Sequence, residues 1–188
     1  PFQILSVARL TGVKNQALIL QALGRLRDID RRWCASFVGQ GPQEAFLKSL
    51  ASRLGVQDAV EFHGQVSRGP ALWSHFDRAD CFVLSSRSEG TPKVLLECMA
   101  RGLPIVASNV SGVPSMVKHG VSGLLYGDND VEGLVNALRK LSESPQLCES
   151  MAAAAQAFCQ EHTVELATTR MLDKVYARWP DLKQLDSR

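Results

Sequence analysis

The sequence has no long apolar segment, no run of five like charges and no two cysteines in a CxxC arrangement. A helix that crosses a membrane needs about 20 apolar residues, so the sequence predicts no such helix. Its net charge of +2 over 188 residues is too small to favour a nucleic-acid groove or a membrane-surface helix. The five cysteines are an odd number, which disfavours a disulfide or zinc scaffold and favours a reducing compartment.

Several ligand signatures are missing as well. There is no GxxxxGKS or GxxxxGKT loop, and Gly39-Gln40-Gly41 begins a dinucleotide fingerprint whose third glycine position holds Glu44. A bound NAD or FAD is therefore not expected. The four histidines are scattered, and no cluster of carboxylates and histidines has metal-ligand spacing, so no metal site is predicted. No signal peptide precedes the first strand-like run, and this abrupt start indicates a fragment.

Short apolar runs alternate with longer helical patterns along most of the chain. This alternation predicts an α/β fold: a Rossmann-like open parallel sheet of about six strands with helices on both faces. One domain is expected over residues 1–180, with a helical C-terminal region at 131–179 and a polar tail at 181–188. The strands are expected at 3–8, 34–38, 60–63, 81–85, 105–108 and 123–126, and the intervening helices at 15–28, 43–54, 69–78, 93–102 and 113–119.

Ligands of such sheets bind beyond the carboxyl ends of the strands, so the loops that follow the strands are the candidate sites. The loop after the first strand carries Arg9 and Lys14. An arginine can bind a phosphate through two parallel hydrogen bonds, and a lysine can add a mobile positive charge. For an unselected pair of cations, however, plain solvation is the commoner outcome.

The loop after the fourth strand, residues 85–97, is the most informative. Pro92 fits the first position of a helix, and exposed amides at a helix N-terminus favour anions such as a diphosphate. Glu89 and Glu97 flank these amides and would repel a phosphate, so hydroxyl groups are their natural partners. A sugar nucleotide carries hydroxyls at both ends and a diphosphate in the middle. A capping Glu89 and a solvated Glu97 explain the spacing equally well.

Taken together, these segments resemble the C-terminal, donor-binding half of retaining GT-B glycosyltransferases of the "group 1" class. The resemblance covers nearly the whole chain and depends on the order of its motifs. The motifs are Val7-Ala8-Arg9-Leu10 with Lys14-Asn15, Val38-Gly39-Gln40-Gly41-Pro42, Phe62-His63-Gly64, Glu89 to Glu97 as an E-x7-E motif, Leu103-Pro104-Ile105-Val106-Ala107-Ser108, and Gly120 with Gly123-Leu124-Leu125.

The resemblance implies a role for each matching residue. Arg9 and Lys14 would neutralise the departing nucleoside diphosphate, and Glu89 would accept hydrogen bonds from the donor sugar, so these three are the expected catalytic residues. Glu97 would bind the ribose. The remaining donor-binding residues implied are Gly39, Gly41, Gly64 and Val66 beside the nucleobase, and Gly90, Thr91, Pro92, Lys93 and Val94 around the phosphates.

The reaction implied is transfer of a sugar from a UDP- or GDP-sugar to an acceptor, with retention of configuration and without a metal or other cofactor. The acceptor, a glycan or lipid-linked glycan, would bind an N-terminal domain that the chain lacks, as would any membrane surface. The setting implied is glycan or surface polysaccharide synthesis in the cytoplasm or at the inner face of the cell membrane. No nucleic acid is expected to bind.

The chain departs from the class at Ser115, where a glutamate is common after the Ser-Gly turn.

Two kinds of alternative stay open. A GT-B-type nucleotide-sugar epimerase half would share the fold, whereas a phosphorylase half would need a pyridoxal-phosphate lysine for which there is no motif. A non-catalytic doubly wound binding module would leave Glu89 and Glu97 as surface residues.

Overall fold

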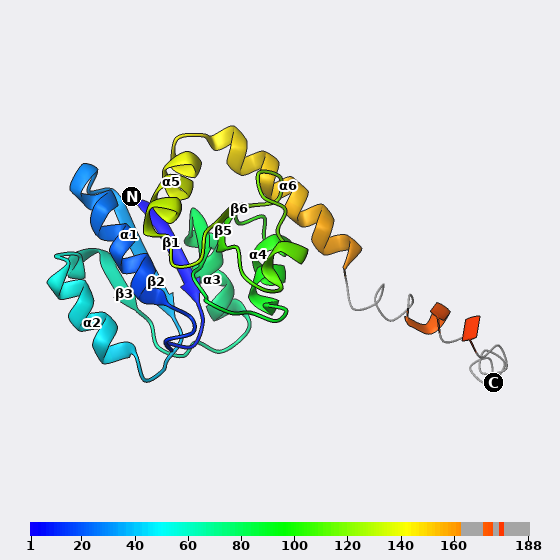
Figure 1. The fold of residues 1–188 in the computed structure, drawn as a ribbon, viewed down its shortest axis with the longest axis horizontal. Helices are drawn as coiled ribbons and strands as arrows, with labels where there is room; N and C mark the ends of the chain where they lie inside the picture. The colour runs from blue at the N-terminus through cyan, green and yellow to red at the C-terminus, as the bar shows by residue number, and fades with distance from the viewer. Residues whose placement is uncertain (163–170, 175–176, 179–188) are drawn as a thin grey trace.

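The computed structural model describes residues 1–162, 171–174 and 177–178. Its sheet has six parallel strands in the order β3-β2-β1-β4-β5-β6. Because helices cover both faces of the sheet, the predicted α/β Rossmann-like fold is confirmed (Figure 1). The strands are β1 (Phe2–Val7), β2 (Trp33–Val38), β3 (Val60–Phe62), β4 (Cys81–Leu84), β5 (Ile105–Ser108) and β6 (Leu124–Tyr126).

The helices divide between the two faces of the sheet, and each face has its own hydrophobic cluster. One face packs against α1 (Gln16–Ile29), α2 (Glu44–Arg53) and α5 (Val131–Ser142), and the other against α3 (Pro70–Arg78) and α4 (Lys93–Ala100). The long helix α6 (Pro145–Glu161) contributes Met151 to the first cluster and Ala155 to the second. It therefore links the two layers of helices (Figure 1).

Strand β1 shows how the sequence produces this arrangement. Successive side chains of a strand point to opposite faces, so Ile4 packs in the cluster under α1 while Leu5 packs in the cluster under α3 and α4. Both residues are almost completely buried. Strands β4 and β5 are buried at every position, as expected for parallel strands with helices on both sides.

Two local predictions are wrong. The helix expected at 113–119 is only a short 3-10 helix, Val113–Ser115. It ends early because the amide of Lys118 donates to the Ser122 hydroxyl instead of continuing the helical bonding pattern. Pro92, which fits the first helical position by its sequence, is instead the N-cap of α4, with extended backbone (φ −72°, ψ 100°); the helix itself begins at Lys93, the start of the expected range 93–102. The proline ring suits the N-cap because it sets φ, while ψ remains free to be extended.

The C-terminal region is helical where it is described, in α5, in α6 and over 171–174 and 177–178. Helix α6 begins at Pro145 with Ser144 as its N-cap residue. Most of the final helix expected up to residue 179, and the expected polar tail at 181–188, lie outside the described residues.

Candidate functional site

The strand order reverses direction between β1 and β4, and this is the point where doubly wound sheets bind ligands. Two loops meet there: the β1–α1 loop (residues 8–15) and the β4–α4 loop (residues 85–92). The amide of Arg87 donates to the Val13 carbonyl at 2.9 Å, and the Ser85 hydroxyl donates to the Lys14 carbonyl at 2.8 Å. The two loops with the most informative motifs are therefore bonded to each other.

Lys14 and Glu89 form an ion pair across this junction. The Lys14 Nζ atom lies 2.6 Å from Glu89 Oε1, and the Ser86 hydroxyl donates to the same oxygen at 2.5 Å. The Glu89 side chain is only 8% exposed, so its carboxylate is held in one place. None of the described residues donates a hydrogen bond to its other oxygen, Oε2. That oxygen can accept hydrogen bonds from a bound hydroxyl group.

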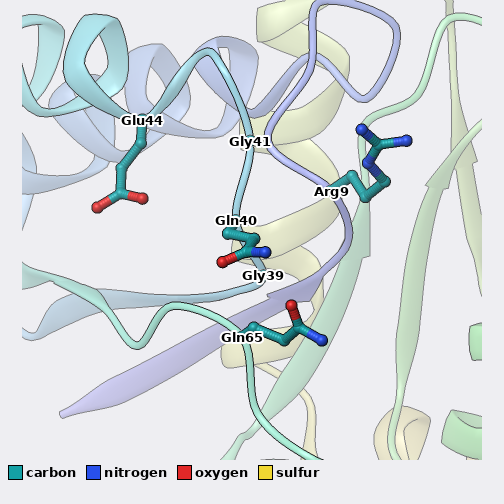
Figure 2. A pocket seen from close by; sticks show the side chains of 6 residues that line it. All are labelled: Arg9, Gly39, Gln40, Gly41, Glu44 and Gln65. Carbon is teal, nitrogen blue, oxygen red and sulfur yellow. The ribbon is translucent and has the colours of Figure 1, made fainter.

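Arg9 lies on the same loop but has an exposed side chain that makes no hydrogen bond or ion pair with the described residues. It borders a pocket of about 580 Å³ together with Gly39, Gln40, Gly41, Glu44 and Gln65. Figure 2 shows its guanidinium on the opposite side of Gln40 from Glu44. A cation without a counter-ion at the mouth of a pocket is suited to bind an anionic ligand.

Two glycines allow the β2–α2 loop (residues 39–43) to approach the β1–α1 loop. Gly39 has φ of +136°, and a Cβ atom on it would overlap the carbonyl oxygen of Ala8. A Cβ atom on Gly41 would overlap the carbonyl oxygen of Leu10. The Gly39 amide also donates to the Gly64 carbonyl at 2.7 Å, which ties in the β3–α3 loop (residues 63–69). Backbone contacts thus fix the relative positions of the β1–α1, β2–α2 and β3–α3 loops, which border the pocket.

The N-terminus of α4 lies at the other side of the junction. Among the described residues, none accepts a hydrogen bond from the amides of Gly90, Thr91 or Lys93, which leaves three donors for an anion. Val94 is half-buried in the first turn, where it packs against the cluster under α3 and α4. Val66 packs against the same cluster from the β3–α3 loop.

Glu97 lies one turn into α4, as its spacing predicts, and its side chain is 33% exposed. Its Oε1 atom is 3.8 Å from Nη2 of Arg68 in the β3–α3 loop. No motif in the sequence singles out Arg68, and Ser86 has no predicted role although it lies in the 85–97 loop. The packing of the loops brings Arg68 to Glu97 and Ser86 to Glu89.

Ser115 occupies the position where a glutamate is common in the class that the chain resembles. Its hydroxyl donates to the Gly112 carbonyl at 2.7 Å and so closes its own turn. Gly112 itself donates to the Glu89 carbonyl at 3.2 Å. Ser115 therefore supports the β4–α4 loop indirectly and presents no carboxylate to the site.

In the described part of the chain, no group of three or more histidine, cysteine, aspartate or glutamate residues has an arrangement that could hold a metal ion. Nor does any helix there have the length and apolar character that crossing a membrane requires.

Comparisons with known proteins agree with one another. A family model described as "Glycosyl transferases group 1" matches residues 1–158. The chain is 32% identical over 184 residues to the amylovoran biosynthesis glycosyltransferase AmsK of Erwinia amylovora, a match that covers 95% of this chain and 45% of that protein. This chain thus spans about half the length of the curated relatives that it matches.

Solved structures show the same fold. The crystal structure of HepE from Anabaena in complex with UDP-glucose superposes with a TM-score of 0.83 and 25% identity, over 94% of this chain and 49% of that one. The C-terminal domain of a group 1 glycosyl transferase, LpcC from Francisella tularensis, superposes with a TM-score of 0.76 and 20% identity, over 85% and 84% of the two chains.

Proposed function

This chain belongs to the glycosyl transferases group 1 family, and from that premise we propose that it is the donor-binding half of a retaining glycosyltransferase. It would bind a nucleoside-diphosphate sugar, with UDP or GDP as the nucleotide. The observation that carries the proposal is the junction of the β1–α1 and β4–α4 loops, where Lys14 and Glu89 pair at 2.6 Å and three amides have no acceptor among the described residues. This arrangement offers positive charge, amide donors and a carboxylate acceptor within one site.

Each group has a chemical task in this proposal. Negative charge develops on the diphosphate as the bond to the sugar breaks, so fixed cations there stabilise the transition state more than the ground state. Arg9 and Lys14 supply that charge, which is the role that a divalent metal plays in other transferases. The amides of Gly90, Thr91 and Lys93 hold the phosphate oxygens.

The two carboxylates contact the uncharged parts of the donor. Glu89 uses its unpaired Oε2 atom to accept hydrogen bonds from the sugar hydroxyls, and Glu97 accepts them from the ribose. The nucleobase occupies the pocket bordered by Gly39, Gly41 and Gln65, next to Gly64 and Val66. The volume of about 580 Å³ is in the range of small-molecule sites.

A second domain would bind the acceptor. The support is that the chain spans about half of its curated relatives and that its fold matches the C-terminal domain of LpcC. The acceptor would be a glycan or lipid-linked glycan of a bacterial polysaccharide, in line with the name of the AmsK relative. Residues 1–180 would form the donor domain, and contact with a membrane surface would lie on the other domain.

Nucleotide binding tests the proposal on the chain itself. UDP or GDP should raise its melting temperature and give a calorimetric affinity, and Arg9→Ala and Lys14→Ala should each weaken that affinity because each removes a cation at the diphosphate. In the longer enzyme, each substitution should lower turnover about 10²–10³-fold, the usual cost of one preorganised contact. Lys140→Ala, which removes an exposed lysine of α5, is the control for the loss of a positive charge.

Two results would count against the proposal. If neither UDP nor GDP changes the melting temperature, the chain is a binding module of another kind. If both nucleotides bind but Arg9→Ala and Lys14→Ala behave like Lys140→Ala, the diphosphate is held elsewhere. Analysis of the products of the longer enzyme by NMR distinguishes sugar transfer with retention from an inverting transfer and from epimerisation.

A further inference from the structure

The side chain of Gln16 is buried beside the site in an unusual way. Gln16 is the first residue of α1 and is only 2% exposed. Its amide nitrogen Nε2 donates to the carbonyl oxygen of Arg9 at 3.0 Å. Its amide oxygen Oε1 is the one buried side-chain polar atom in the described part of the chain that has no hydrogen-bond partner.

An unpaired buried acceptor is costly, because the atom has given up its hydrogen bonds to water without gaining others. An apolar side chain of the same shape would avoid that cost, since it would bury neither the donor nor the acceptor. Such exceptions in native structures call for a specific reason. Among the described residues, the one hydrogen bond of the Gln16 side chain is to Arg9, which points to that contact as the reason.

The residue before Gln16 likewise uses its side chain to contact a loop and not to cap the helix. Asn15, the N-cap residue of α1, makes no capping hydrogen bond with its side chain and has left-handed backbone with φ of 49°. Its side-chain amide instead donates to the Asn129 side chain at 3.4 Å. Polar groups that usually cap a helix are thus directed to the neighbouring loops.

The side chain of Arg9 needs such support. It is exposed and has no partner among the described residues, so within the described part of the chain only the position of its backbone restricts where the guanidinium can reach. The Arg9 carbonyl accepts two hydrogen bonds, from the Thr11 amide at 3.0 Å and from Gln16 at 3.0 Å. The first lies within the loop itself, whereas the second attaches the loop to helix α1.

We propose that Gln16 is a positioning residue that holds the backbone of Arg9 so that the guanidinium faces the diphosphate of the donor. This inference rests on the proposed function and adds a residue to its machinery. Gln16 does not touch the ligand: it acts through Arg9. A group that is oriented before the ligand arrives loses less freedom on binding, and the diphosphate is therefore bound more tightly.

A double-mutant cycle with Arg9 tests the proposal. Calorimetry with UDP or GDP, whichever binds the wild-type chain, is repeated on Gln16→Met, Arg9→Ala and the double variant. Gln16→Met should weaken binding about tenfold, the lower end of what removing an orienting partner costs at metal ligands. In the Arg9→Ala background the same substitution should have no further effect on binding, because the backbone bond is still possible but the guanidinium that it positions is gone.

Stability supplies a second readout. Methionine fills a similar volume and removes the unpaired oxygen, so the melting temperature of Gln16→Met should stay at or above that of the wild type. Gln21→Met, at an exposed position of the same helix, is the control and should change neither quantity. If Gln16→Met does not fold, Gln16→Asn replaces it, because a shorter amide stays polar but is too short to make the bond to Arg9.

The outcomes separate this inference from the function that it rests on. If the wild-type chain binds neither UDP nor GDP, the proposed function fails. If Arg9→Ala weakens binding but the effect of Gln16→Met is absent, or is equally large in both backgrounds, the positioning role is overturned. A loss of the fold with both Gln16 substitutions would overturn it too, because Gln16 would then be a structural residue.

Discussion

Glu89 and Glu97 are eight positions apart in one motif, yet their surroundings differ. The Glu89 side chain is 8% exposed and is held by Lys14 and Ser86. The Glu97 side chain is 33% exposed and lies 3.8 Å from Arg68, itself highly exposed, so this contact contributes little to stability. A rigid carboxylate suits the reacting sugar, and a more accessible one suits the ribose at the outer part of the donor.

The ribose role of Glu97 predicts a specific loss. Glu97→Ala should weaken UDP or GDP binding by about 10- to 150-fold, because a hydrogen bond to a charged group contributes about 1.5–3 kcal/mol. It should weaken the matching 2′-deoxynucleotide less, since part of the interaction is already missing. Calorimetry with both nucleotides measures the difference. Glu149→Ala on α6 is the control, and equal losses for both nucleotides would disprove a contact with the 2′-hydroxyl.

At the scale of elements, the site depends on how closely the loops approach. Gly112, after β5, donates to the Glu89 carbonyl, and a Cβ atom on it would overlap the carbonyl oxygen of Gly90. The backbone of the β4–α4 loop is therefore in direct contact with the backbone of the loop that follows β5. The position of Glu89 is set from two sides, by Lys14 of the β1–α1 loop and by Gly112.

Gly112→Ala should consequently disturb both stability and binding. The added methyl group must displace the β4–α4 loop, and overpacking of this kind typically costs about 1–3 kcal/mol. Thermal or urea unfolding measures the loss, and calorimetry should show weaker nucleotide binding. In Gly24→Ala the new Cβ would meet its nearest neighbour at an ordinary 4.0 Å, so this substitution within α1 should be neutral or stabilising. Similar stability of the two variants would contradict the close approach.

Element boundaries show what local sequence can predict. Strand β5 has the predicted ends, and most of the other strands and helices begin and end within about two residues of their predicted limits. The error at 113–119 has a local cause, because the Lys118 amide donates to the hydroxyl of Ser122, only four residues further along the chain. The spacing of apolar residues, from which helices are predicted, gives no information about a hydrogen bond between a backbone amide and a serine side chain in the following turn.

At the scale of the whole molecule, one face of the sheet near β3 carries polar groups. A pocket of about 340 Å³ there is lined by residues that include Ser36, Glu61, His63, His75 and Arg78. The rings of His63 and His75 lie 4.4 Å apart. Burial lowers the pKa of His75 below its ordinary value of 6.5, and the charges of His63 and Arg78 lower it further, against an opposing effect of Glu61.

This shift predicts how stability depends on pH. The unfolded chain binds a proton at His75 at a higher pH than the folded chain does, so protonation favours unfolding. The contribution of His75 is present above its ordinary pKa of 6.5 and is lost as the pH falls through 6.5 toward the lower folded value. His75→Gln should therefore make the fall in melting temperature on the acid side shallower. His162→Gln controls for the loss of a histidine, and an unchanged slope in His75→Gln would refute the prediction.

The sequence by itself determined the fold class and the edge of the sheet that holds the site. Alternating helical and strand patterns are local properties, and in a parallel sheet the loops that follow the strands meet at one edge. Only the tertiary structure decided which side chains meet there. Lys14 and Glu89 are 75 positions apart, and Gln16, which the motifs did not single out, bonds to the backbone of Arg9. Such contacts depend on how loops of different strands pack together, and neither composition nor spacing within one segment encodes that packing.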